Sequence, residues 1–192
     1  MQTNEFNKVL NDIKNNLVTD ISLFDENHSV RQVIEIAEAL KINNNLIGIY
    51  LGGNRIGNEG AIAIAEALKV NRTLTKFSLR KSQIGDKVAM AIAEALKVNK
   101  ALTHIHFGHN QIGDKGATAI AEALKVNDTL TALYLLNNLI GDEGAIAIAE
   151  ALKVNRTLTN IDLRYNQIGD KAAAAIAKVS NKVSNKTLID IR

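Results

Sequence analysis

The chain has 192 residues and a formal net charge of +3, and it contains neither cysteine nor proline. Without cysteine there are no disulfides and no thiolate metal sites, so the composition favours a cytoplasmic setting, unless a signal that the sequence does not reveal delivers the chain elsewhere. The small, mixed charge and the lack of a long apolar run or a secretory signal predict neither nucleic-acid binding nor a membrane partner.

Residues 1–17 predict an N-terminal capping helix. After a helix start at Thr3 or Asn4, apolar residues follow helical spacing at Phe6, Val9, Leu10, Ile13 and Leu17. The residues that follow repeat, and the end of a repeat array must close the core, so we expect this helix to cover the first strand. An amphipathic arm that binds a partner is the alternative interpretation.

Residues 18–187 predict six repeats of one supersecondary unit. Leucines recur every 28 residues, at Leu46, Leu74, Leu102, Leu130 and Leu158. A period of this length indicates stacked units, because a single unit cannot bury its own apolar face. The first unit, from Val18, is divergent, but Ile21 and Leu23 are still expected to be buried.

Each unit is predicted to form a short strand, a turn and a helix. In the unit from Leu130, the pattern L-x-x-L-x-L is typical of a strand with one buried face. Asn138, at the ninth place, is predicted to bond the backbone as the chain leaves the strand. Asp142, after the turn, is predicted to cap the helix that follows. The ninth-place asparagines of other units are Asn54, Asn110 and Asn166.

The predicted helices repeat a charged outer face. Glu and Lys stand three residues apart at Glu38-Lys41, Glu66-Lys69, Glu94-Lys97, Glu122-Lys125 and Glu150-Lys153. Such pairs contribute roughly 0.3 kcal/mol each, so this face is interpreted as solvated rather than as a binding stripe. The N-x-S/T triplets that begin at Asn71, Asn127, Asn155 and Asn185 are interpreted as a by-product of the repeat.

These motifs resemble the leucine-rich repeat, specifically its 28-residue ribonuclease-inhibitor-like type. The resemblance covers residues 18–192. It implies an α/β solenoid shaped like a horseshoe, with a parallel β-sheet on the concave face and α-helices on the convex face. The same type forms sensor domains of innate immune receptors and the body of Ran GTPase-activating proteins, and it implies no particular ligand.

Residues 188–192, LIDIR, predict a partial seventh strand. The preceding polar segment KVSNKVSNK carries two extra residues and is expected to help cap the last unit. A bare edge strand has unpaired backbone groups, so weak end-to-end self-association is expected at high concentration.

Strand residues that point away from the core are predicted to form the concave face, and they differ from unit to unit. Tyrosine and arginine are typical of binding hot spots. The candidate partner-binding residues are Tyr50, Lys76, Arg80, His104, His106, His109, Tyr134, Leu136, Asp162, Arg164 and Tyr165. The sequence therefore predicts a scaffold that binds a protein partner on this face.

Three of the four histidines fall in one unit, at His104, His106 and His109. A metal there would lack an adjacent carboxylate or thiolate and would lie near cations such as Lys76 and Arg80, so neither a metal nor a cofactor is predicted. The histidines favour a different hypothesis, that binding changes between about pH 7 and 5, where imidazoles gain charge.

No catalytic constellation is recognisable in the sequence. There is no cysteine nucleophile, G-x-S-x-G, H-E-x-x-H or phosphate-binding loop, so a non-enzyme is predicted. The alternative function follows from the resemblance to Ran GTPase-activating proteins. It is a regulator that accelerates a small GTPase, with Arg80 or Arg164 acting on the transferred phosphate.

Overall fold

The computed structural model describes residues 3–54, 56–180 and 188–191. In these ranges seven helices alternate with seven strands. The helices are α1 (Thr3–Lys14), α2 (Val30–Ile42), α3 (Gly57–Val70), α4 (Asp86–Val98), α5 (Asp114–Leu124), α6 (Asp142–Leu152) and α7 (Asp170–Ser180). The strands are β1 (Asp20–Ser22), β2 (Gly48–Tyr50), β3 (Lys76–Ser78), β4 (His104–His106), β5 (Ala132–Tyr134), β6 (Asn160–Asp162) and β7 (Leu188–Asp190).

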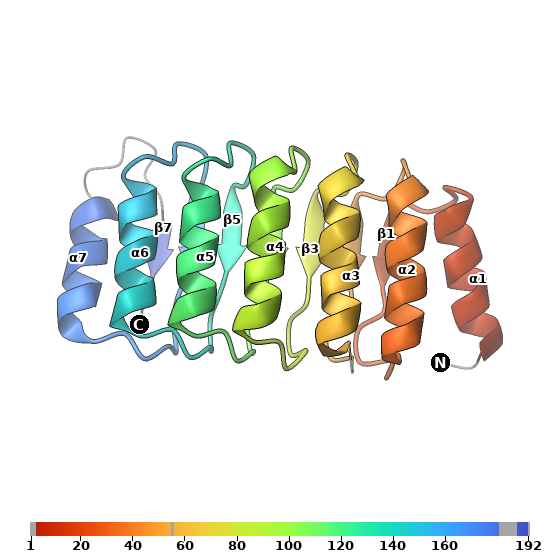
Figure 1. Cartoon of the computed structure of the whole chain (residues 1–192), viewed down its shortest axis with the longest axis horizontal. Coiled ribbons are helices and arrows are strands. Elements are labelled where there is room, and N and C mark those ends of the chain that lie inside the picture. The colour runs from red at the N-terminus through yellow and green to blue at the C-terminus, as the bar shows by residue number, and fades with distance from the viewer. Residues whose placement is uncertain (1–2, 55, 181–187, 192) are drawn as a thin grey trace.

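The strands form one open parallel sheet in chain order, from β1 to β7. The register is constant, so that Lys76 aligns with His104 and His104 with Ala132. Equivalent places of successive units therefore lie side by side. The helices form a second layer, in front of the strands in Figure 1. The predicted α/β solenoid, with its parallel sheet on the concave face and its helices on the convex face, is confirmed.

The hydrophobic core fills the space between the sheet and the helices. In a central unit the strand side contributes Leu102, Ile105 and Phe107, the helix side contributes Ile120, and all four are fully buried. Phe77 of the preceding unit meets Phe107 edge-on, with ring centroids 6.1 Å apart. Each such side chain contributes about 1.5–3 kcal/mol on burial, and the units share one continuous core.

Each ninth-place asparagine ties its unit to the one before it, whereas the unit from Leu74 has Ser82 at this place. Asn110 Nδ2 donates to the carbonyls of Leu79 and Phe107, both at 2.8 Å, and Asn110 Oδ1 accepts from the Ser82 N–H at 3.0 Å. Equivalent bonds to the backbone are made by Asn54, Asn138 and Asn166. The predicted role of these asparagines is confirmed, and it includes a bridge between units that the prediction lacked.

A second asparagine ladder, which sequence analysis did not identify, lies where each helix returns to the sheet. Asn99 is fully buried, its Nδ2 donates to the Leu68 carbonyl at 2.7 Å, and its Oδ1 accepts from the Leu102 N–H at 2.8 Å. Equivalent bonds are made by Asn43, Asn71, Asn127 and Asn155. The asparagine of the N-x-S/T triplets in this region is therefore a structural requirement of the fold.

The turn aspartates cap the helix of the next unit. Asp114 Oδ1 accepts from the N–H groups of Gly141 at 2.7 Å and Gly144 at 2.8 Å, where α6 begins. Asp142 Oδ1 accepts from the Gly169 N–H at 2.6 Å in the same way. The N-cap of α6 itself, Gly141, has no side-chain cap. The prediction that Asp142 caps its own helix is wrong, because parallel stacking brings the amides of the following turn against this carboxylate.

Helix α1 lies at the N-terminal end of the stack (Figure 1) and contacts α2. Its residues in the core are Phe6, Leu10 and Ile13. Leu17, predicted to belong to the same stripe, is 65% exposed, so this part of the prediction is wrong. The helix ends at Lys14, and the chain has left the helical register before it reaches Leu17. Ile21 and Leu23 of the first unit are buried, as predicted.

Strand β7 pairs in parallel with β6, and Ile189 and Ile191 pack half-buried against the core. Residues 181–187, which include most of the predicted polar cap, lie outside the described residues. End-to-end self-association stays a prediction, which sedimentation at increasing protein concentration can check. Within the described ranges, no helix is both long enough and apolar enough to cross a membrane.

Candidate partner-binding site

The concave face consists of the third, fifth, seventh and eighth places of each unit, counted from the leucine that opens it. The parallel register brings these places into four rows across the sheet. The candidate residues of the sequence analysis all lie in these rows, from Tyr50 on β2 to Tyr165 after β6. Lys76 and His104 are exposed in the third-place row, whereas Leu136, in the seventh-place row, is half-buried.

A hollow of about 170 Å³ lies at the centre of the concave face. Along the fifth-place row the order is Tyr50, Ser78, His106 and Tyr134. The rings of His106 and Tyr134 are stacked, with centroids 5.2 Å apart and planes inclined by 26°. Ser78 is the small member of the row, so the space above its strand stays open between Tyr50 and the stacked pair. The sequence analysis did not predict this hollow.

Arg80 stands between two glycines in the seventh-place row, Gly52 and Gly108. A Cβ added at Gly108 would meet the side chain of Leu136, which would have to move, so the glycine makes room for the neighbouring leucine. Arg80 therefore has no side chain beside it in its own row, and its guanidinium reaches His109 Nε2 at 3.3 Å.

The backbone at the eighth place is left-handed in every unit. Its φ angles are 59° at Asp25, 73° at Gly53, 57° at Lys81, 59° at His109, 51° at Asn137 and 56° at Tyr165. This conformation lets the amide donate to the next unit, as His109 N–H does to the Leu136 carbonyl at 2.9 Å. It costs a residue with a Cβ roughly 1–2 kcal/mol. The side chain of Tyr165 is 71% exposed to solvent, and its backbone adopts the strained left-handed conformation.

His109 is held between two polar side chains. Its Nε2 faces Arg80 and its Nδ1 lies 2.8 Å from the side-chain amide of Asn137. Arginine only donates, so Nε2 can accept from Arg80 only while that nitrogen carries no proton. Desolvation, and then the charges of Arg80 and Lys81, lower the pKa of His109.

Desolvation also lowers the pKa of His106, with Arg80 and His109 acting in the same direction and Asp162 opposing them. Both imidazoles therefore take up protons below the ordinary histidine range. The proposed dependence of binding on pH stays a prediction, and these two shifts move its expected onset to lower pH.

Asp162 and Arg164 form an ion pair at the C-terminal end of the face. Arg164 donates from Nε at 3.0 Å and from a terminal nitrogen at 2.8 Å to the two oxygens of Asp162, and Nε also lies 3.1 Å from Asp190. Burial raises the pKa of Asp162. The hydrogen bonds and the charge of Arg164 together lower it by a larger amount, so the net shift of the pKa is downward. Asp162 is only 6% exposed, and its geometry is that of a residue that positions Arg164.

Metal ligands do not gather on this face. His104 and His106 have Lys76 and Ser78 beside them on β3, and neither of these is a carboxylate. In the described part of the chain, no three His, Cys, Asp or Glu residues are grouped so that they could hold a metal ion.

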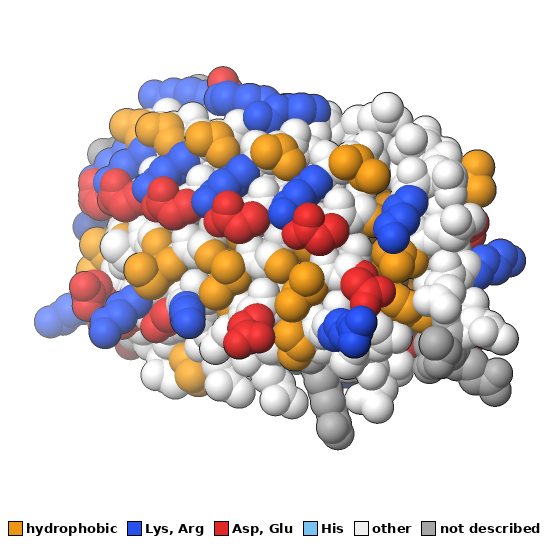
Figure 2. Space-filling view, turned by 45° about the vertical axis from the view of Figure 1, so that its right-hand side comes forward, with side chains coloured by type: hydrophobic (Ala, Val, Ile, Leu, Met, Phe, Trp, Pro, Cys, Tyr) orange, Lys and Arg blue, Asp and Glu red, His pale blue; other side chains and the backbone are white. Residues whose placement is uncertain are grey.

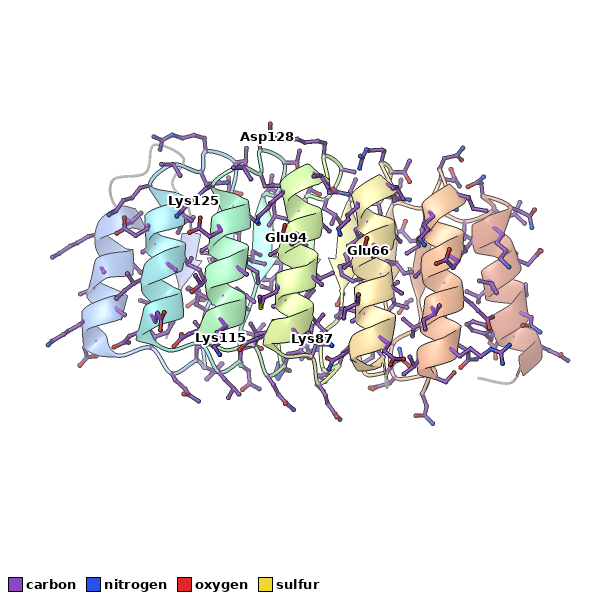
Figure 3. All side chains as sticks on the ribbon, viewed as in Figure 1. Glu66, Lys87, Glu94, Lys115, Lys125 and Asp128 are labelled. Atoms are coloured by element: carbon purple, nitrogen blue, oxygen red, sulfur yellow. The ribbon has the colours of Figure 1, made fainter. Side chains whose placement is uncertain are left out.

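The helix face of the molecule is regular by comparison. Lys69 and Glu66, like Lys97 and Glu94, form ion pairs of 2.6 Å within a helix. Figure 2 shows these side chains as adjacent blue and red rows across the helices, and Figure 3 places Glu66 and Glu94 at matching positions on α3 and α4. Beside the lysines runs a row of exposed aliphatic side chains, which are Ile42, Val70, Val98, Val126 and Val154.

Among solved structures, the chain is similar to the structure titled "Leiomodin-1 Actin-Binding Site 2 (ABS2)". The two share 28% sequence identity at a TM-score of 0.66, covering 94% of this chain and 88% of the other. The tropomodulin C-terminal domain of Caenorhabditis elegans shares the fold, with 13% identity, a TM-score of 0.60, and coverage of 93% of this chain and 92% of the other.

No curated protein matches the sequence significantly. The repeats themselves match a known family, described as "Leucine Rich repeat", over residues 43–65, 70–93, 98–121, 126–149 and 154–177. These five matches have the 28-residue period of the structural units and together cover more than half of the chain. The chain belongs to the leucine-rich repeat family.

Proposed function

We propose that this protein is a non-enzymatic scaffold that binds a protein partner on its concave face. The observation that carries the proposal is the contrast within one repeat. The helix face repeats the same ion pair from unit to unit, whereas the concave face presents different aromatic and charged side chains around a central hollow. Aromatic residues and arginine around such a hollow are the composition of binding hot spots.

The comparisons support a protein partner and suggest the first one to test. The leiomodin-1 structure is described as an actin-binding site, and its likeness extends over most of both chains. Actin is therefore the first purified protein to assay. A cytoplasmic location and the ribonuclease-inhibitor-like subtype are parts of the same proposal.

The experiment compares partner capture by the wild-type protein with capture by Tyr134→Ala and Arg80→Ala. Immobilised protein is presented to purified actin and to an extract of the native cell, and retained proteins are identified by mass spectrometry. Each substitution is expected to weaken a retained partner by about 1 kcal/mol or more, roughly fivefold in Kd, with unchanged helical content by circular dichroism. The control is Lys87→Ala, on the exposed surface of α4 (Figure 3). Equal capture by all four proteins would place the site elsewhere.

The alternative, acceleration of a small GTPase, has less support. Arg164 is already held by Asp162, and neither similar structure is described as a GTPase-activating protein. Arg80 is the better placed of the two arginines for such a role because the one hydrogen bond of its guanidinium within the described residues is to a histidine. Single-turnover GTP hydrolysis by a panel of small GTPases, with wild-type protein or Arg80→Ala, tests it. The alternative requires faster hydrolysis with the wild type alone.

A further inference from the structure

The centre of the concave face carries positive charge without compensating carboxylates. The strand and turn segments 74–85, 102–113 and 130–141 contain Lys76, Arg80, Lys81 and three histidines but no aspartate or glutamate. Asp162, one strand further on, is engaged by Arg164.

The central cations also lack ion-pair partners, in contrast to those of the helix face. Lys97 and Lys125 each have a glutamate at 2.6 Å. No carboxylate among the described residues lies within ion-pair distance of Lys76, Arg80 or Lys81. Lys76 and Lys81 are exposed, so a carboxylate of a partner can pair with them, and opposite charges at such a surface give specificity and speed association.

The hollow beside these cations suits an apolar side chain. Its sides include the rings of Tyr50, His106 and Tyr134, and beneath it lies the backbone of β3 and β4, because the side chains of Phe77 and Ile105 are buried in the core on the other side of the sheet. Lys76 also lines it, so a positive charge stands at the edge of an apolar recess. At about 170 Å³ it can receive one large side chain but not a folded element. An extended segment crossing the strands could therefore insert one side chain here and place its neighbours over the cations.

We propose that the partner contributes an acidic segment with one large apolar anchor, which enters the hollow while flanking carboxylates bind Lys76, Arg80 and Lys81. This inference rests on the proposed function, since it specifies what the concave face recognises. The aromatic walls bury the anchor, and the cations select the charge of the flanking residues. Ser78 sets the depth of the hollow because it is the small residue between Tyr50 and His106.

Three short fluorescein-labelled peptides test the proposal by fluorescence anisotropy. The first is a run of glutamates and aspartates with one central phenylalanine, the second has alanine in place of the phenylalanine, and the third has lysines in place of the acids. Binding is expected in the order first, second, third, and it is expected to weaken as salt rises. Equal binding of the acidic and the lysine peptide would overturn the proposal.

Two variants locate the interaction. Lys76→Glu reverses a charge beside the hollow and is expected to weaken the phenylalanine peptide about tenfold. Lys87→Glu makes the same change in net charge on the first turn of α4, far from the strands, and is expected to leave binding unchanged (Figure 3). Ser78→Leu fills the hollow and should abolish the preference for phenylalanine over alanine, after circular dichroism has confirmed its fold. Equal losses with the two lysine variants would show a non-specific charge effect and overturn the proposal.

The outcomes separate this inference from the proposed function. If Tyr134→Ala and Arg80→Ala reduce partner capture but the acidic peptide binds no better than the lysine peptide, the concave face binds a partner of another chemistry. If capture is unaffected by both variants, the proposed function itself fails. Specific peptide binding would in that case show only that the hollow can hold such a segment. It would no longer support the proposal that the partner contributes that segment.

Discussion

The helix face and the concave face belong to the same repeat units. The side chains of the helix face recur from unit to unit, whereas those of the concave face differ. On the helices, each unit from the second helix to the sixth carries the same Glu-Lys pair, with the lysine nitrogen 2.5 to 2.6 Å from its glutamate. On the concave face the fifth-place row reads Ser22, Tyr50, Ser78, His106, Tyr134 and Asp162. Stacking places the same demands on every unit, so residues that serve the fold recur. A residue that breaks the pattern is not required by the stack.

The largest effect on stability is expected at Asn99, a fully buried asparagine of the second ladder. Asn99→Ala should lower the free energy of unfolding by about 3 kcal/mol, because it leaves the Leu68 carbonyl and the Leu102 N–H without their buried partner. Urea denaturation followed by circular dichroism measures it. Glu94→Ala, on the solvated row of the same helix, is the control and should change stability by less than about 0.5 kcal/mol. Similar losses for the two would erase the distinction between buried and surface repetition.

A smaller loss is expected where a repeated side chain joins two units at the surface. Asp114→Ala removes two hydrogen bonds to the start of α6 and should cost about 1–2 kcal/mol. Hydrogen exchange should show the greatest loss of protection in the first turn of α6, because the carboxylate caps that helix and not its own. Loss of protection confined to the first turn of α5 would contradict the cross-unit cap.

Tyr165→Gly should have the opposite sign. Glycine relieves a left-handed backbone that costs roughly 1–2 kcal/mol, against an entropic penalty of about 0.5–1 kcal/mol, so a net gain of about 0.5–1 kcal/mol in stability is expected. If Tyr165 belongs to the binding surface, the same variant should bind the partner less tightly. A stabilised variant with undiminished binding would remove Tyr165 from the site, and a destabilised one would show that the tyrosine has a structural role.

The smallest effect concerns pH. The lowered pKa values of His106 and His109 mean that the folded protein binds fewer protons than the unfolded chain just below the ordinary histidine pKa of 6.5. Stability should therefore be fully present above this range and fall as pH drops through it. His109→Asn, which copies the residue at Asn137, should flatten the slope of the urea midpoint between about pH 7 and 5. An unchanged slope would contradict a neutral, desolvated imidazole at this position.

Much of this architecture could be predicted from sequence because it depends on local periodicity. The L-x-x-L-x-L pattern located the strands, and the ninth-place asparagines such as Asn138 were assigned correctly to the backbone. The cap by Asp142 was assigned to the wrong helix because its true partner, Gly169, is 27 residues away and is brought near only by stacking. Leu17 fitted a stripe whose helix ends at Lys14, and helix ends are set by local backbone geometry rather than by spacing.

The site was harder to predict than the fold because it depends on side-chain conformation. The strand register, predictable from the repeat, brought Tyr50 and Tyr134 onto one face. The hollow needed the additional information that the ring of His106 stacks on Tyr134, so that space remains beside the small side chain of Ser78. The burial of Asp162 had a signal in the sequence, since Arg164 stands two places further along the same strand face.

The two asparagine ladders and the aspartate caps share one property: each side chain reaches a fixed distance back or forward along the chain. Asn71 and Asn99 bind carbonyls 31 residues before them, and Asp86 and Asp114 bind amides 27 and 30 residues after them. Removing or inserting a whole unit therefore keeps this spacing, whereas a half unit would leave donors and acceptors unmatched. The units with Ser82 at the ninth place and Asn58 at the aspartate place are exceptions. The length of such an array therefore changes in steps of one 28-residue unit. A gene that gains or loses one 28-residue block changes the concave face by one strand's width, about 4.8 Å, and keeps the backbone register of the remaining units.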